Sequence, residues 1–267
     1  MIESLHSPHV ARVKALIGSR GVKERRQAGL FIAEGLQAAR EALAVPGAPF
    51  IKTLYVTSAG LLKLSDFDLN EVDVVEVTDS VMAEMTSTVS PQGVLALCVL
   101  PRRDIKEIAP LASKKSARIV YLHEIQDPGN AGTILRTADA MGVDAVITSP
   151  GSVDMYSPKV VRATAGSLWH IPLFESINFS EVSGILPEAK ALLFSSHATS
   201  SILDLPRDES YISIFGNEAR GVDAQSLGLS SAAVTSVTIP MAGRAESLNL
   251  SAAASIVIFT LSAPVAG

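Results

Sequence analysis

From residue 118 onward, short apolar segments alternate with stretches of helical periodicity, and this alternation constrains the fold more than any other feature. Short apolar runs bounded by turn residues indicate buried strands, whereas Asn130–Met141 carries its apolar residues on one helical face. Strands that alternate with helices in this way form mostly parallel sheets with helices on both faces. The sequence therefore predicts an α/β fold with strands at Ile119–Leu122, Val143–Thr148, Ile171–Phe174, Ala191–Ser195, Ile212–Phe215 and Val234–Ile239, and further helices at Pro158–Thr164 and Ser247–Leu261.

The N-terminal part carries a second, smaller α/β pattern. Its predicted elements are a helix at about Glu34–Leu43 and strands at Leu30–Ile32, Lys52–Thr57, Val72–Val77 and Val94–Leu100. The basic, proline-containing stretch that follows separates the two patterns and predicts a linker. We therefore expect an N-terminal domain at 1–100, a linker at 101–117 and a C-terminal domain at 118–267.

Composition excludes several classes of protein. With 267 residues, 48% of them hydrophobic and 18% charged, the chain is expected to be globular and ordered. No apolar run approaches the roughly 20 residues that span a bilayer. The single cysteine, Cys98, excludes an intramolecular disulfide and a cysteine-rich zinc site, and it is predicted to be a core strand residue. These features predict a cytoplasmic protein that uses no metal and does not enter a membrane.

The net charge of −5 does not by itself indicate a nucleic-acid-binding protein, but the basic residues are unevenly placed. Many of them gather near the N-terminus, namely Arg12, Lys14, Arg20, Lys23, Arg25, Arg26 and Arg40. Such a cluster suits contact with nucleic-acid phosphates. It is equally consistent with the solvated faces of surface helices, and charge alone does not choose between the two interpretations.

The first candidate motif is Asp127–Arg136, which follows a predicted strand and opens a helix. Gly129 and Gly132 permit a tight turn, and Asn130 is placed to cap the helix. A plain strand-to-helix turn with an exposed arginine would look similar. The glycines do not form the Gly-x-Gly-x-x-Gly fingerprint of dinucleotide-binding folds, and no phosphate-binding Gly-Lys-Ser/Thr follows.

Two further motifs follow predicted strands. Ile214–Val222 runs from a buried strand into a loop in which Glu218 is the one carboxylate between two glycines. Ile239–Ala253 runs from a strand through a proline-containing loop into an apolar helix whose start is interrupted by Ser247 and Asn249. The simpler interpretations are a surface turn with a Glu–Arg pair and a serine N-cap. A buried amide such as that expected for Asn249 needs hydrogen-bond partners, which favours a functional role.

Together the three motifs resemble those of the SpoU (TrmH-type) branch of the SPOUT methyltransferases. The resemblance rests on Asn-x-Gly-x-x-x-Arg, Phe-Gly-Asn-Glu-x-x-Gly and Ile-Pro-Met…Ser-Leu-Asn-Leu-Ser, and it covers roughly residues 118–267. The segments Arg25–Gly35 and Ser90–Val94 are similar to the small RNA-binding domain common in this branch. Length and layout resemble the ribosomal-RNA members more than the minimal tRNA members.

The resemblance implies a C-terminal domain with a deep trefoil knot, S-adenosylmethionine bound in the knot, and a homodimer that shares its active site between subunits. By position, Arg136 matches the family's catalytic arginine. The other matched active-site positions are Asn130, Glu218, Ser247 and Asn249. The adenosine pocket is expected around Gly216, Ile239, Met241 and Leu248, bordered by the loop after Ala191–Phe194. The expected RNA-binding residues are Arg25, Arg26 and Arg162.

The predicted activity is transfer of a methyl group from S-adenosylmethionine to a ribose 2′-hydroxyl of structured RNA, with 23S ribosomal RNA as the expected substrate. A guanidinium rarely loses its proton in proteins, so Arg136 is expected to stabilise the developing alkoxide electrostatically. Two alternatives remain open: methylation of tRNA, and an RNA-binding homologue that has lost activity. A dinucleotide-dependent enzyme is disfavoured by the missing glycine fingerprint.

Overall fold

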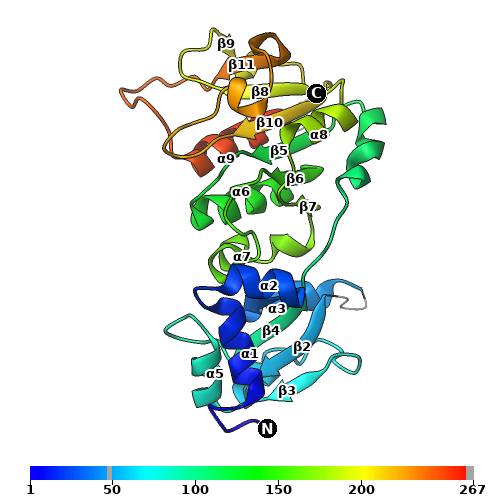
Figure 1. Ribbon diagram of the computed structural model, residues 1–267, viewed down its shortest axis with the longest axis vertical. Coiled ribbons are helices and arrows are strands. Elements are labelled where there is room, and N and C mark those ends of the chain that lie inside the picture. The colour runs from blue at the N-terminus through cyan, green and yellow to red at the C-terminus, as the bar shows by residue number, and fades with distance from the viewer. Residues whose placement is uncertain (47–49, 263–267) are drawn as a thin grey trace. The chain divides into compact units, whose positions relative to one another are not determined.

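The computed structural model describes residues 1–46 and 50–262, and the chain forms two compact units (Figure 1). The first unit comprises Met1–Arg102 together with Asp154–Trp169, and the second comprises Arg103–Val153 and the chain from His170 onward. The predicted boundaries differ from this division, because they are continuous and place 154–169 in the C-terminal domain. The end of the predicted domain, 263–267, lies outside the described residues.

The predicted linker also has a different structure. Within 101–117 the chain forms a 3-10 helix, Ile105–Ser113, which begins with a capping box made by Asp104 and Glu107. Ile105 and Ile108 of this helix are buried in the hydrophobic core of the second unit. Pro110 lies inside the helix, so the prolines that suggested a break do not prevent this segment from packing.

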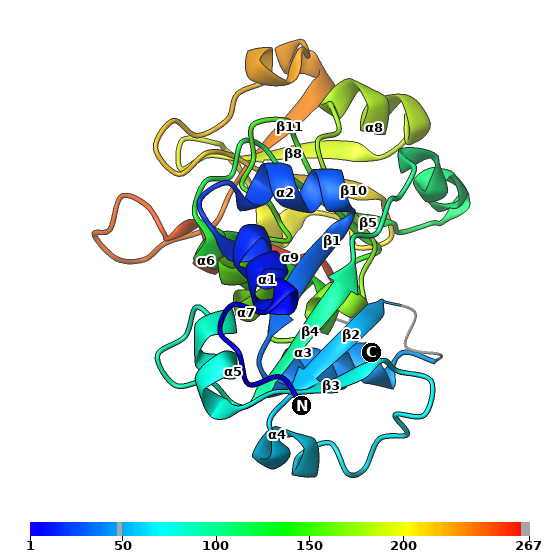
Figure 2. The same ribbon diagram turned by 60° about the horizontal axis from the view of Figure 1, so that its bottom comes forward.

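The first unit contains a sheet of four strands in the order β1-β4-β2-β3. Strand β4 pairs antiparallel with β1 and β2, and β3 pairs parallel with β2 (Figure 2). The sequence did not indicate this mixed pairing. The elements of this unit are α1 (Pro8–Ile17), α2 (Gly21–Ala28), β1 (Leu30–Glu34), α3 (Leu36–Ala44), β2 (Ile51–Val56), α4 (Ser58–Leu62), β3 (Val74–Glu76), α5 (Asp79–Met85), β4 (Val94–Val99) and α7 (Pro158–Thr164).

Helices cover both faces of this sheet. On one face α1 and α5 pack on the strands through a cluster that includes Val13, Met82 and Leu97. Helices α3 and α7 contact β1 on the other face of the sheet. All five residues of β1 are buried, as are the first five of β4, as expected for strands covered on both sides. Cys98 lies in β4 at 0% exposure, and burial raises the pKa of its thiol.

The second unit is built on a sheet of seven strands in the order β7-β6-β5-β10-β8-β11-β9. Every pairing recorded between these strands is parallel, which confirms the prediction of a mostly parallel sheet. The elements are β5 (Arg118–Leu122), α6 (Pro128–Ala140), β6 (Ala145–Thr148), β7 (Leu173–Phe174), α8 (Phe179–Ile185), β8 (Lys190–Phe194), β9 (Ser200–Ser201), β10 (Tyr211–Phe215), β11 (Val234–Thr238) and α9 (Leu250–Ser262), with short 3-10 turns between some of them.

The two faces of this parallel sheet are also covered. Alternate side chains of the central strands, such as Tyr121 and Ile214, pack with Phe179 and Val182 of α8 and with the 3-10 helix Ile105–Ser113. Helices α6 and α9 pack against each other, α6 against β6 and α9 against β10. Within 1–46 and 50–262, no helix has the length and apolar character needed to cross a lipid bilayer.

The segment Asp154–Trp169 is tied to the first unit by a buried ion pair and a buried indole. The guanidinium of Arg25 contacts the Asp154 carboxylate at 2.6 Å, and the two side chains are 4% and 6% exposed. The indole N–H of Trp169 donates to the carbonyl oxygen of Ala38 at 2.9 Å, and its ring packs on Phe31. A segment distant in sequence therefore completes the core of the N-terminal unit.

Candidate functional site

Three loops of the second unit begin at the carboxyl ends of parallel strands. The loop after β5 leads into α6, the loop after β10 begins at Gly216, and the loop after β11 begins at Ile239. Strands β5, β10, β8 and β11 are neighbours in the sheet, so these loops meet at one edge. Crevices at the carboxyl ends of parallel strands are the usual place for ligands in α/β folds.

Helix α6 begins at Pro128, and the side chain of Asp127 caps it by accepting from the backbone N–H of Asn130 at 2.7 Å. The expectation that Asn130 is the cap was therefore wrong. Proline suits the first helical position, since its missing N–H would have had no partner there. Because Asp127 takes the capping role, the side chain of Asn130 is available for contacts with the other two loops.

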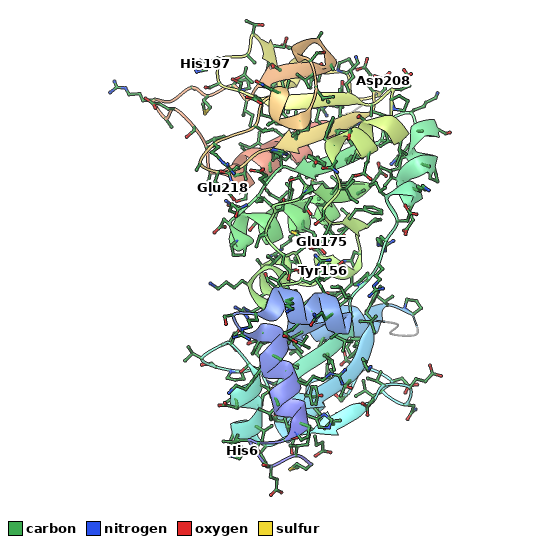
Figure 3. All side chains as sticks on the ribbon, in the orientation of Figure 1. His6, Tyr156, Glu175, His197, Asp208 and Glu218 are labelled. Carbon is green, nitrogen blue, oxygen red and sulfur yellow. The ribbon has the colours of Figure 1, made fainter. Side chains whose placement is uncertain are left out.

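The carboxylate of Glu218, which is labelled in Figure 3, links the second loop to the first through hydrogen bonds. It accepts the backbone N–H groups of Gln126 and Asp127 at 3.2 and 3.1 Å and the side-chain amide of Asn130 at 3.3 Å. Partial burial alone would raise the pKa of Glu218, but hydrogen bonds from backbone N–H groups and Asn130 outweigh it and leave the pKa below its ordinary value. Glu218 is therefore ionised, and its hydrogen bonds hold the two loops together.

Asn249 links the third loop to the same network. Its side-chain amide donates to Oδ1 of Asn130 at 3.3 Å, and its own Oδ1 accepts from the backbone N–H groups of Ser251 and Ala252 at 2.9 and 3.2 Å. Asn249 therefore caps α9, which begins at Leu250 rather than at Ser247 as expected. The side chain is exposed rather than buried. Its predicted need for partners is nevertheless met, by one contact to the first loop and several to its own helix.

Two adjoining cavities lie among these loops. The larger, about 700 Å³, is lined by the predicted active-site residues Asn130, Glu218, Ser247 and Asn249, and by Gly216. The smaller, about 150 Å³, is lined by apolar side chains and by residues of the loop after β8. The residues shared by both cavities are Phe194, Ser247, Leu248 and Ala253.

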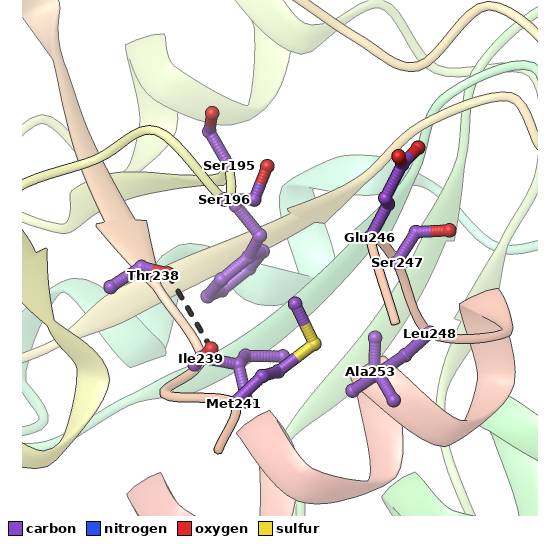
Figure 4. Close-up of a pocket in the computed structure, with 10 residues that line it drawn as sticks. Ser195, Ser196, Thr238, Ile239, Met241, Glu246, Ser247, Leu248 and Ala253 are labelled. Carbon is purple, nitrogen blue, oxygen red and sulfur yellow. Dashed lines mark hydrogen bonds between the residues drawn. The ribbon is translucent and has the colours of Figure 1, made fainter. Parts of the chain in front are cut away.

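Figure 4 shows the smaller cavity, into which the Met241 side chain reaches between Ile239 on one side and Leu248 on the other. Ser195 and Ser196 also line it, so the chain after β8 borders the cavity, as expected. The structure thus brings all four residues predicted for an adenosine pocket to the walls of two cavities that share a boundary.

Close packing of the second loop requires a glycine at position 216. A Cβ atom at this position would lie 2.5 Å from the carbonyl carbon of Gly221 and 2.6 Å from Cβ of Val222. Two turns of the second loop therefore approach so closely that only glycine fits. The side-chain amide of Asn217 also donates to the carbonyl oxygen of Glu124 at 3.0 Å, which ties this loop to the end of β5.

Arg136 is not part of either cavity. It lies on α6 about 9 Å beyond Asn130, at 1.5 Å of rise per residue, and its side chain is exposed. Among residues 1–46 and 50–262, none forms a hydrogen bond or an ion pair with it. The sequence identified Arg136 together with Asn130 in one motif, but the helix separates the two side chains.

The arginines predicted to bind RNA have different environments. Arg25 is 3% exposed, and its guanidinium contacts Asp154 and the carbonyl oxygen of Leu16. The expectation that Arg25 grips RNA phosphates is corrected, because its hydrogen-bonding groups are occupied inside the protein. The side chain of Arg26 is 45% exposed, and that of Arg162 is 31% exposed beside a cavity of the first unit.

Sequence reasoning missed several residues of the site. Asp127 is the helix cap and also lines the larger cavity, and Glu246 lines the smaller one. The rings of Phe194 and Phe215 stack with their centroids 5.1 Å apart, and both line the larger cavity. An aspartate three residues before Asn130 was a visible capping signal. The aromatic pair gave none, because it joins strands that are neighbours only in the sheet.

In the described part of the chain there is no group of three or more His, Cys, Asp or Glu side chains arranged to hold a metal ion. The site instead consists of a clamp of one carboxylate and two amides beside an apolar cavity lined by Met241, Ile239 and Leu248. Such a combination suits an organic ligand with an apolar body and a few polar groups.

Comparison with known proteins agrees with this picture. Residues 117–259 match the SpoU rRNA Methylase family, and residues 8–96 match the MRM3-like substrate binding domain. The chain is 30% identical over 240 residues to the 23S rRNA (guanosine(2553)-2′-O)-methyltransferase RlmP of Bacillus subtilis, a match that covers 90% of this chain and 91% of that protein. It is 29% identical over 261 residues to the 23S rRNA (uridine(2479)-2′-O)-methyltransferase of Streptomyces viridochromogenes, with 92% and 86% covered.

Among solved structures, the AdoMet-bound rRNA methyltransferase of Sinorhizobium meliloti aligns with a TM-score of 0.80 at 27% identity, covering 97% of this chain and 96% of that one. The similarity extends over both units and includes the segments that carry all three motifs. The family match alone spans more than half of the chain. This protein belongs to the SpoU rRNA methylase family.

Proposed function

We propose that this protein transfers a methyl group from S-adenosylmethionine to a ribose 2′-hydroxyl of 23S ribosomal RNA. One observation carries the proposal: the three motifs converge on adjoining cavities through the hydrogen bonds that join Glu218, Asn130 and Asn249. The names of the Bacillus subtilis and Streptomyces viridochromogenes relatives, both 23S rRNA 2′-O-methyltransferases, support the same substrate class. We also propose the cytoplasm as the place of action.

The residues around the cavities fit the methyl donor. Adenosine has an apolar face that Ile239, Met241 and Leu248 would hold, while Ser247 and the backbone near Gly216 offer polar groups. The larger cavity, about 700 Å³, lies within the range of about 300–1,000 Å³ typical of small-ligand sites. When bound, the donor supplies an electrophilic methyl group on a sulfonium, so the protein's task is to position and stabilise the weakly acidic hydroxyl.

Different residues of this chain shape the cavity and stabilise the charge that develops during methyl transfer. Glu218, Asn130 and Asn249 hold the three loops together, which keeps the cavity shaped before a ligand enters. Arg136 stabilises the negative charge that develops on the ribose oxygen as the hydroxyl proton passes to water or to an RNA phosphate, because a guanidinium remains protonated and offers several donors in a fixed plane. Preorganised charge of this kind lowers the barrier without needing to rearrange during the reaction.

We further propose that the active site is shared between two subunits. Arg136 lies outside the cavities of its own chain, and it has no hydrogen-bonding partner among the described residues. Helix α9, which packs beside α6, exposes Ile256 and Phe259 at 41% and 59%. Burial of these side chains against a second copy would favour a dimer that brings Arg136 of one chain toward the cavity of the other. We also propose the trefoil knot for the second unit, and the match of residues 117–259 to the SpoU rRNA Methylase family supports it.

The test of the function is direct. The purified protein, incubated with unmodified 23S rRNA and labelled S-adenosylmethionine, should place one methyl group on a ribose, which mass spectrometry of nuclease fragments would locate. Bulk tRNA in a parallel reaction should remain unlabelled. Labelling of tRNA alone would favour the tRNA alternative, and no labelling of either RNA despite donor binding would favour an inactive homologue.

Gly216→Ala should reduce affinity for S-adenosylmethionine by at least about tenfold, because the new Cβ would collide with the backbone of Gly221 and with Val222 and displace the wall of the cavity. Isothermal titration calorimetry would measure this affinity. Gly243→Ala is the matched control, since a Cβ at Gly243 meets nothing within 4 Å. Equal affinities for Gly216→Ala and the unaltered protein would show that this loop does not line the donor site.

A further inference from the structure

The first unit contains a cavity of about 350 Å³ to which the proposed reaction assigns no role. It lies where β1 passes through Gly35 into α3, and where the loop after α5 returns to β4. Arg162 and Ala165, at the end of α7 and just beyond it, form another part of its wall. Its volume falls at the lower end of the range of small-ligand sites, about 300–1,000 Å³, which suits one nucleotide rather than a duplex.

Glu34 holds this cavity in shape. Its carboxylate is 5% exposed and accepts the backbone N–H of Ser87 at 3.2 Å, the hydroxyl of Ser87 at 2.9 Å and the backbone N–H of Thr88 at 3.0 Å. Arg162 donates to the same carboxylate at 3.0 Å and to the Ser87 hydroxyl at 2.6 Å. The loop after α5 is thereby fixed to β1 and α7, so the cavity is formed before any ligand arrives.

Two glutamines on the wall of the cavity offer complementary hydrogen-bonding groups. Oε1 of Gln92 accepts the backbone N–H of Leu36 at 2.8 Å, which leaves its NH₂ group to donate. The NH₂ group of Gln37 donates to the carboxylate of Glu41 at 2.6 Å, which leaves its carbonyl oxygen to accept. Both orientations follow from the partners, because a backbone N–H can only donate and a carboxylate can only accept.

An amide donor and an amide acceptor beside one cavity match the edge of a nucleobase, which presents donors and acceptors side by side. RNA is recognised mostly in this way at unpaired positions, where a base is splayed out of the stack and hydrogen-bonded along its edge. No sequence pattern indicated this pair, because Gln37 and Gln92 are 55 positions apart and belong to different elements.

The rim adds an apolar contact and a positive charge. Val89 lies between the cavity-lining residues Thr88 and Ser90 and is fully exposed, at 101%. Val89 itself does not line the cavity, but its exposed apolar side chain stands on the loop that borders it and is available to contact the face of a base that enters there. Lys63 is exposed, and its ammonium group donates to the carbonyl oxygen of Gln92 at 2.9 Å, which places a cation at the same rim for an adjacent phosphate.

We infer that this cavity receives one unpaired nucleotide of the RNA substrate. Gln37 and Gln92 bind the edge of its base, Val89 packs on its face, and Lys63 contacts a neighbouring phosphate. The inference rests on the proposed function, in that it takes the substrate to be RNA. It adds a recognition site in the N-terminal unit that is separate from the residues of the methyl-transfer site.

The experiment uses the full-length protein and 23S rRNA transcribed in vitro. The double variant Gln37→Ala/Val89→Ser should raise the dissociation constant for this RNA by about tenfold or more, on the scale of a lost base contact. The slope of affinity against salt concentration should stay the same, because no phosphate contact is removed. In methyl transfer the loss should fall on KM for RNA rather than on kcat. The matched control is Gln225→Ala/Leu203→Ser, which alters an exposed glutamine and an exposed leucine of the second unit.

A footprint identifies the nucleotide. Dimethyl sulfate and carbodiimide probing should reveal an unpaired base that the unaltered protein protects and that the double variant leaves reactive. Unchanged RNA affinity together with an unchanged footprint would overturn the inference while leaving the proposed function intact. Failure of the unaltered protein to bind 23S rRNA would overturn both. The fluorescence of Trp169, which is buried in the same unit as the two substitutions, verifies that the first unit of the variant is folded.

Discussion

Arg136→Ala should lower the rate of methyl transfer to RNA by at least about a hundredfold while leaving affinity for S-adenosylmethionine unchanged. The rate should fall because removal of a preorganised donor at a developing oxyanion costs this much in other enzymes. Donor binding should persist because the role assigned to Arg136 is at the ribose oxygen of the RNA, and the walls of the two cavities that would hold the donor are made by other residues. Single-turnover transfer of labelled methyl groups and calorimetry would measure the two quantities on the same preparation.

Two controls sharpen this test. Arg103→Ala removes an exposed arginine that pairs with Glu107 on the 3-10 helix, and it should leave the rate unaltered. Arg136→Lys should recover little activity, since an ammonium group lacks the planar set of donors of a guanidinium. Full activity of Arg136→Ala would reject the role assigned to this arginine.

Mixed dimers test whether the site is shared. If Arg136 serves the cavity of the other subunit, a mixed dimer of Arg136→Ala and Glu218→Ala chains contains one intact site, and random mixing should restore about a quarter of the original activity. Each variant alone should be nearly inactive. Formation of mixed dimers without any recovery would show that Arg136 and Glu218 act from the same chain.

Asp154→Ala should destabilise the first unit by about 3–5 kcal/mol, because it leaves the guanidinium of Arg25 buried without its partner. Both side chains are almost fully buried, so water cannot replace the lost carboxylate. Urea unfolding followed by tryptophan fluorescence would measure this change, since the single tryptophan, Trp169, is buried in the same unit.

The matched comparison replaces both partners. Arg25→Met/Asp154→Leu should recover most of the lost stability, because two apolar side chains leave no buried charge unpaired. Lys14→Ala, which breaks an exposed ion pair with Glu84 in the same unit, should change the free energy of unfolding by no more than about 1 kcal/mol. A small effect of Asp154→Ala would mean that the segment Asp154–Trp169 does not depend on this ion pair for its place in the first unit.

Several elements were predicted from local pattern alone. Residues Pro158–Thr164 form the expected helix α7, and the predicted strands of the second unit are observed within a few residues of their predicted ends. Helices α1, α2, α4, α5 and α8 were missed. Helix α1 buries Val10, Val13 and Leu16 on one face and begins at Pro8 after a serine N-cap, so its signal was present but short.

The sequence by itself determined the strand–helix alternation, the three motifs and hence the family. Each of these depends on residues that lie close together along the chain. Only the tertiary structure showed that Arg25 is buried against Asp154, that Arg136 lies outside both cavities, and that Gln37 faces the same cavity as Gln92. The sequence does not distinguish a charged or polar residue that is exposed to water from one that contacts a buried partner or a ligand. Its environment is decided by which distant segments the fold packs beside it.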